Sequence, residues 1–266
     1  VLGSGLTNIS GSVISNAAIN QGINISGDLT ISATNVGGSV SNGGSLTLND
    51  GTLNNTVFGQ GSTIISGSVI SNAAINQNIN ISGALTSNAD NIGGTVTNSN
   101  NLTLTGGTLN QTVNGTGSTS ITGSVTANNA LNQAINISDS GSLAANASNI
   151  GGIVTNSNIL TLTDGTLNQT INGTGSTNIT GTVLGNAAMN QALNITGSLT
   201  ANADNIGGTV SNSNDLTLTG GTLNQKVSGS GTTTVTGSVT NNETVAQDVT
   251  ITASGTLTNN LSLIHI

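Results

Sequence analysis

Apolar residues along the chain recur at intervals of two and at much longer fixed intervals. The pairs Ile79 with Ile81 and Leu102 with Leu104 have the two-residue spacing that places both side chains on one face of a strand. No segment shows the 3.6-residue period of an amphipathic helix. The pattern therefore predicts short strands with one buried face, and no helices.

The chain consists of copies of one long repeat. Each copy opens with Gly, then Ser or Thr, then Val, and the openings lie at Gly11, Gly67, Gly123, Gly181 and Gly237. They recur about every 56 residues, with the third interval slightly longer than the others. Aliphatic columns run through the copies, for example Ile25, Ile81, Ile137, Ile195 and Ile251. Such repetition predicts units that bury their apolar faces only by stacking on their neighbours.

Each long repeat divides again. The segments 75–79, 92–96 and 109–113 share an apolar residue, three small or polar residues and a second apolar residue. Their starts are evenly spaced, and the next copy, at Leu131, follows after a longer step. We therefore predict an all-β fold, a right-handed parallel β-helix (β-solenoid) of about 14 coils of about 19 residues, with three coils per 56-residue repeat. Residues 1–260 are expected to form a single β-solenoid repeat domain, an internal fragment of a larger protein.

The last six residues, 261–266, read LSLIHI, which back-translates to a transposon end sequence used to tag sequencing libraries. We interpret them as a translated sequencing-adapter artefact. The alternative is a genuine apolar final strand. The first interpretation removes His265, the only histidine, from any catalytic role.

Composition leaves few groups for chemistry. Nine acidic residues face a single Lys or Arg, the formal net charge is -8, and Pro, Cys, Trp and Tyr are absent. Basic phosphate clamps, zinc binding by cysteine and aromatic stacking are thereby excluded, so no nucleic-acid partner is expected. Abundant Val, Ile and Thr argue against disorder. No apolar run reaches the roughly 18 residues of a membrane-spanning helix, so no membrane-spanning segment is expected.

Asparagines also recur in register. One column holds Asn16, Asn72, Asn128, Asn186 and Asn242, and another holds Asn42, Asn98, Asn156 and Asn212. Stacked amides can hydrogen-bond from coil to coil. Both columns are therefore interpreted as ladders at turns.

The carboxylates occupy columns whose other members cannot do acid–base chemistry. Asp50 and Asp164 share a column with Gly106 and Gly220, and Asp90 and Asp204 share one with Ser148 and Thr34. A turn permits exchange of Asp with Gly or Ser, whereas a catalytic acid does not. We therefore predict no catalytic, cofactor-binding or metal-binding residue, no cofactor and no enzyme activity.

Three further features have unremarkable interpretations. The glycine-rich nonapeptide and the EF-hand loop that bind calcium are absent. Lys226 stands in a column of threonines and is expected on a solvated face. Phe58 replaces asparagine or serine and is expected to make a local packing contact.

The segments GGTVTNSNNLTLTGGTLNQTV (93–113) and GSVTNNETVAQDVTITASGTLTNN (237–260) resemble repeats of large bacterial exoproteins, namely filamentous-haemagglutinin-type adhesins and autotransporter passengers. The resemblance covers nearly the whole chain up to Asn260. It implies a right-handed β-helical stalk that is extracellular or anchored to the outer membrane of a Gram-negative bacterium. It also implies host-cell or bacterial surface receptors, bound through regions not identifiable in this chain.

Other functions remain open at this stage. The strand Leu102-Thr-Leu-Thr105 and its copies at Leu46, Leu160 and Leu216 turn threonines outward, which would suit an ice- or surface-binding solenoid. That pattern occurs once per three predicted coils and is therefore sparse. A polysaccharide-degrading β-helix enzyme and a functional amyloid are less favoured alternatives. Because a solenoid end is an unpaired sheet edge, end-to-end self-association is also expected.

Overall fold

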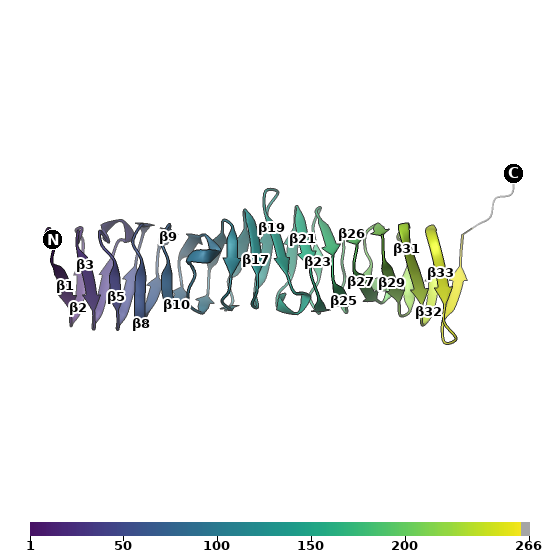
Figure 1. The fold of residues 1–266 in the computed structure, drawn as a ribbon, viewed down its shortest axis with the longest axis horizontal. Helices are drawn as coiled ribbons and strands as arrows, with labels where there is room; N and C mark the ends of the chain where they lie inside the picture. The colour runs from purple at the N-terminus through teal and green to yellow at the C-terminus, as the bar shows by residue number, and fades with distance from the viewer. Residues whose placement is uncertain (262–266) are drawn as a thin grey trace. The chain divides into compact units, whose positions relative to one another are not determined.

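The structure, a computed structural model, describes residues 1–261. Parallel strands stack as a β-solenoid of about 15 coils, which confirms the predicted fold class (Figure 1). The right hand of the winding stays a prediction. Residues 262–266, which include His265 and most of the suspected adapter sequence, lie outside the described residues. The chain divides into two compact units, Val1–Ile135 and Asn136–Ile266, and each is described by itself.

In the first unit, neighbouring strands form three columns of parallel pairs. The first contains β1 (Leu6–Ile9), β3 (Gly22–Ile25), β5 (Val40–Asn42) and the starts of β8 (Val57–Ile65) and β10 (Ile75–Ile81). The second contains β2 (Ser12–Ser15), β4 (Asp28–Ile31), β6 (Ser45–Leu48), the ends of β8 and β10, β12 (Val96–Asn98) and β15 (Val113–Asn114). The third contains β7 (Gly51–Leu53), β9 (Ser68–Ser71), β11 (Ala84–Ser87), β13 (Asn101–Leu104) and β16 (Ser118–Ile121). A further pair joins β14 (Gly107–Leu109) to β17 (Ser124–Ala127), and the short 3-10 helices are η1 (Ala33–Asn35) and η2 (Ala89–Asn91).

The second unit follows the same plan. One column contains β19 (Ser142–Ala145), β21 (Ile159–Leu162), β24 (Ser176–Ile179), β26 (Ala192–Ile195), β28 (Val210–Asn212) and the starts of β31 (Val227–Val235) and β33 (Val245–Ile251). Another contains β22 (Gly165–Leu167), β25 (Thr182–Gly185), β27 (Ser198–Ala201), β29 (Asp215–Leu218) and the ends of β31 and β33. Shorter sets are β20 (Val154–Asn156) with β23 (Ile171–Asn172), and β30 (Gly221–Leu223) with β32 (Ser238–Asn241) and β34 (Thr256–Asn259). The 3-10 helices are η3 (Ala147–Asn149) and η4 (Ala203–Asn205), and β18 (Ala134–Ile137) contains the boundary between the units.

The coils are slightly shorter and more numerous than the sequence pattern indicated. Paired residues are 16 positions apart between Leu6 and Gly22, 17 between Leu85 and Leu102, and 18 between Val113 and Leu131. The expected coil was longer because the last step of each repeat was measured from Leu109 to Leu131. In the structure Leu131 is instead the partner of Val113.

As a consequence, successive copies of the 56-residue repeat do not return to the same column. In the first unit Leu46 pairs with Leu29 and Thr63, in the second column. Its copy Leu102 pairs with Leu85 and Thr119, in the third column. In the second unit β21 and its copy β29 likewise lie in different columns. Each copy is therefore turned by one column relative to the previous copy.

The interior is lined by the predicted aliphatic columns. Ile25, Ile81, Ile137 and Ile195 are exposed by 1% or less, whereas Ile251, in β33, is 49% exposed. Strand after strand alternates buried with exposed positions, as β10 does over its seven residues. The burial of these side chains and the backbone hydrogen bonds between coils both require stacked neighbours. Each coil is therefore stabilised by the coils on either side of it.

Candidate functional site

Polar side chains enter the interior at regular places. Gln133 donates from Nε2 to Oγ1 of Thr119, and both residues are almost fully buried. Its Oε1 accepts a hydrogen bond from Nδ2 of Asn98 at 3.2 Å. The second unit repeats the arrangement, since Gln191 contacts Thr177 and accepts from Asn156 at 3.1 Å. These clusters satisfy the buried amides internally and present nothing to solvent.

The same cluster is incomplete in two copies. Gln77 contacts Thr63, and Gln247 contacts Thr233, but Oε1 of each glutamine has no hydrogen-bond partner among the described residues. The partner strands β8 and β31 are each nine residues long. In the complete cluster of the first unit, the corresponding segment is not one continuous strand: a short loop around Gly115 separates β15 from β16. The incomplete clusters are small local defects, of which the one at Gln77 is buried and the one at Gln247 is partly exposed.

The two asparagine columns behave differently, so one part of the ladder prediction is wrong. Asn72 donates to Oδ1 of Asn54 at 2.9 Å, and Asn128 donates to Asn110 at 2.7 Å, as ladders between adjacent coils. Asn98, in the other column, is buried and donates to the carbonyl oxygen of Ser118 at 3.0 Å. Its Oδ1 accepts from the backbone N–H two residues later. The residues of this second column are buried and form no asparagine ladder; they bond to the backbone and, at Asn98 and Asn156, also to a buried glutamine.

The carboxylates lie at turns, as their columns predicted, and they bind the backbone of the next coil. Oδ1 of Asp50 accepts from the N–H of Ser68 at 2.9 Å, and Oδ1 of Asp164 accepts from that of Thr182 at 2.9 Å. The acceptor atom in each case is 18 residues before the donor. Both side chains thus help to hold one coil on the next.

Asp90 and Asp204 have an equivalent task beside the short 3-10 helices. Oδ1 of Asp90 accepts from the N–H of Thr108 at 2.8 Å, and Oδ1 of Asp204 accepts from Thr222 at 2.8 Å. In the other copies the hydroxyl oxygens of Ser148 and Thr34 accept the corresponding bond. An acceptor oxygen is therefore what this position needs, and its charge is optional.

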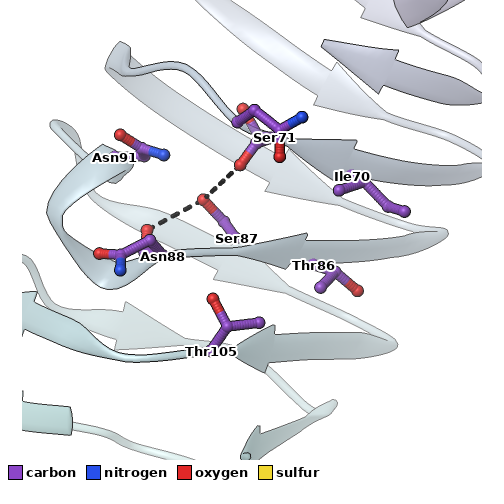
Figure 2. Close-up of a pocket in the computed structure, with 8 residues that line it drawn as sticks. Ile70, Ser71, Thr86, Ser87, Asn88, Asn91 and Thr105 are labelled. Atoms are coloured by element: carbon purple, nitrogen blue, oxygen red, sulfur yellow. Dashed lines mark hydrogen bonds between the residues drawn. The ribbon is translucent and has the colours of Figure 1, made fainter. Parts of the chain in front are cut away.

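A surface depression of the first unit, with a volume of about 230 Å³, lies beside β9 and β11. Figure 2 shows Ser87 between Ser71 and Asn88, and its hydroxyl donates to the Asn88 carbonyl at 2.9 Å. Ser71 and Ser87 are paired on adjacent strands, and the next paired positions on either side are leucines, Leu53 and Leu104. Two short side chains between two long ones leave this space. The volume is below that of typical ligand pockets, and the lining groups are neutral.

The remaining candidates, Phe58 and Lys226, belong to different units. Phe58 is 43% exposed on β8, where it is paired with Ser41 and Asn76. Lys226 is exposed beside the start of β31, and its backbone carbonyl accepts from Val210. Within residues 1–261, no three His, Cys, Asp or Glu side chains gather closely enough to bind one metal ion. That part of the chain also contains no helix with the length and hydropathy of a membrane span.

Comparison of the chain with protein-family models, with curated proteins and with solved structures found no match.

Sequence reasoning missed the buried glutamine–threonine pairs. Five glutamines contact the threonine 14 residues earlier: Gln21, Gln77, Gln133, Gln191 and Gln247. The signal was available, because each long repeat contains Asn-Gln or Ala-Gln at this spacing after a threonine. It was overlooked because a polar pair in an otherwise aliphatic column is not predicted by hydrophobic periodicity.

Proposed function

We propose that this chain is the structural stalk, or display segment, of a secreted or surface-anchored bacterial adhesin of the autotransporter-passenger type, and that it carries out no catalysis. In this proposal it is located outside a Gram-negative cell or on its outer membrane. Receptors on host cells or on other bacteria would be bound by regions beyond residues 1–260. The resemblance of the repeats to those of bacterial exoproteins supports the proposal.

The observation that carries the proposal is the use of the polar side chains. Asp50 and Asp90 accept backbone hydrogen bonds from the following coil. Asn72 pairs with Asn54, and Gln133 pairs with Thr119 and Asn98. These carboxylates and amides are thus engaged in holding coils together. A segment whose polar groups serve stacking is suited to setting a distance.

A spacer must change length when repeats are removed, without loss of folding. Deletion of residues 67–122 joins Ser66 to Gly123 and removes one 56-residue copy. At about 4.8 Å per coil and about 17 residues per coil, the deletion should shorten the chain by about 16 Å. Small-angle scattering gives the maximal dimension, and circular dichroism reports retained β structure.

A deletion of half that length is the matched control. Removal of residues 67–94 breaks the repeat register, so the aliphatic columns no longer align and the melting temperature should fall sharply. Equal stability of the two deletions, or an unchanged maximal dimension in the first, would contradict the spacer role.

The location is tested separately. Antibodies against residues 1–260 should label intact cells that produce the protein, and external protease should remove the label. Labelling only after the cells are permeabilised would refute the surface assignment. The spacer test does not depend on this result.

A further inference from the structure

The register of the second unit aligns four threonines in a file. Thr200 on β27, Thr217 on β29, Thr234 on β31 and Thr250 on β33 are direct partners on consecutive strands. Their neighbours along β27, β29 and β31 are buried, so the threonines of these strands face outward. The file therefore runs along the outer surface of four adjacent strands.

A second file lies two residues further along the chain, just beyond the C-terminal ends of β29, β31 and β33. It contains Thr219, Thr236 and Thr252, which follow Thr217, Thr234 and Thr250 after one intervening residue. Thr236 and Thr252 donate from Oγ1 to the carbonyl oxygens of Leu218 at 3.2 Å and Val235 at 3.3 Å. We name the six residues of these three rungs the threonine face: Thr217, Thr219, Thr234, Thr236, Thr250 and Thr252.

The threonine face offers both order and free hydrogen-bonding capacity. Neighbouring strands of the sheet are about 4.8 Å apart. Bonds to the backbone fix Thr236 and Thr252. Thr217, Thr234 and Thr250 make no side-chain hydrogen bond to the described residues, so their hydroxyls remain available to an external partner. A pre-ordered surface loses little conformational entropy when it binds.

The chemistry of the face selects its partner. It has no basic residue for an anion and no aromatic ring for a sugar, and its groups are hydroxyls and methyls alone. A rigid two-dimensional array of uncharged hydroxyls, separated by methyl groups, fits a solid that itself presents hydrogen-bonding atoms on a lattice. We propose that the threonine face binds ice, with the hydroxyls joining the lattice and the methyl groups excluding disordered water.

Two other outward files also carry hydroxyls, namely Thr222, Thr240 and Thr258 in the second unit and Thr86, Thr103 and Ser120 in the first. In the first unit the file on the second column reads Thr30, Thr47, Ile64 and Asn80. In the second unit, the file through Asn178 and Asn194 is closed by a hydrogen bond between these two amides at 3.0 Å. The threonine face differs from these files because all three of its rungs carry threonine at both positions, whereas asparagines follow two residues after Thr222, Thr240 and Thr258. Thr47 supplies a control position, because like Thr234 it is partly exposed on the outer side of a strand.

The threonine face depends on the short steps between adjacent coils, which are 17 residues from Thr217 to Thr234 and 16 from Thr234 to Thr250. The sequence segments 215–219, 232–236 and 248–252 belong to different parts of the long repeat, yet the register stacks them as consecutive rungs. The inference is independent of the stalk proposal, because a spacer needs no particular outer surface.

The test measures binding to ice directly. The full chain is equilibrated with slowly grown ice, the protein in the ice fraction is quantified, and thermal hysteresis is recorded. Thr234→Lys places a long hydrated side chain in the middle of the face, and the control Thr47→Lys places the same side chain on β6 of the first unit. Circular dichroism and a thermal melt establish that both variants fold.

The parent and Thr47→Lys should enter the ice and show hysteresis, and Thr234→Lys should reduce both by at least about tenfold. Asp215 and Asp248 flank the face, so Asp215→Asn with Asp248→Asn should preserve or increase binding, since fewer hydrated charges border the ice. Absence of hysteresis and of ice partition in the parent would overturn the inference. Equal losses in the two lysine variants, or binding to crystalline polysaccharide without binding to ice, would overturn it as well.

Discussion

The side-chain amide of Asn98 donates a hydrogen bond to Oε1 of Gln133 at 3.2 Å, although the two residues are 35 positions apart. Both are buried, and Gln133 also donates to Thr119. The bond connects residues separated by about two coils of the chain. It is a cross-connection inside the solenoid, in addition to the bonds between adjacent strands.

This bond gives a first prediction, because the copy that contains Gln77 lacks it. Gln133→Leu removes the bonds to Asn98 and Thr119, whereas Gln77→Leu removes only the bond to Thr63 and also eliminates an unpartnered buried oxygen. Gln133→Leu should therefore be more destabilising than Gln77→Leu, by about 1 kcal/mol. Denaturant midpoints of the two variants compare them. Equal midpoints would show that the cross-connection contributes nothing.

A second prediction concerns the acceptor at Asp90. Asp90→Ala leaves the N–H of Thr108 without its partner and should cost about 0.5 to 1.5 kcal/mol. Asp90→Ser should be nearly neutral, because Ser148 accepts the same bond at 2.9 Å in another copy. Amide hydrogen exchange at Thr108 measures the effect locally. Slow exchange in the alanine variant would contradict the assigned role.

The sequence predicted the fold class because the aliphatic columns and the strand-like alternation act together at every copy. The columns through Ile81 and Leu104 read directly as interior rows. The carboxylate at Asp90 could also be assigned to a turn, since serine and threonine replace it. These features are local or repeat in the sequence, and so composition and spacing reveal them.

The rest depends on strand pairing, which spacing alone leaves ambiguous. Pairing of Ile64 with Asn80 and pairing of Ile64 with Thr86 would both place an outward residue of β8 beside an outward residue of a later strand. In the structure, Thr63 pairs with Ile79 and accepts a hydrogen bond from the buried Gln77, and this contact favours the pairing of Ile64 with Asn80. Hydrophobic periodicity does not contain that contact. The column shift and the threonine face follow from it and were therefore missed.

A third prediction tests the close approach of coils at the glycine that opens each repeat. A Cβ atom at Gly67 would lie 1.5 Å from the carbonyl oxygen of Asn49, whereas nothing lies within 4 Å of one at Gly11. Gly67→Ala should thus force the backbone apart and lower the melting temperature by several degrees, through overpacking of about 1 to 3 kcal/mol. Gly11→Ala should leave the melting temperature nearly unchanged. Similar melting temperatures for the two variants would indicate that the coils are spaced differently.

The last prediction decides between the two possible pairings of β8. The structure pairs Ile64 with Asn80 and places Thr86 in the next column, paired with Ile70. If the repeat copies kept one column, Ile64 would instead pair with Thr86. Adjacent strands lie about 4.8 Å apart, which is within the Cα separation that a disulfide spans.

The chain contains no cysteine, so paired substitutions can be read without interference. Under mild oxidation, Ile64→Cys with Asn80→Cys should form an intramolecular disulfide, detected as loss of free thiol and a mobility shift on a non-reducing gel. Ile64→Cys with Thr86→Cys should remain reduced. A disulfide in the second variant and none in the first would instead indicate that successive repeat copies return to the same column. It would also separate the three rungs of the threonine face, because their alignment follows from the same short step between β31 and β33.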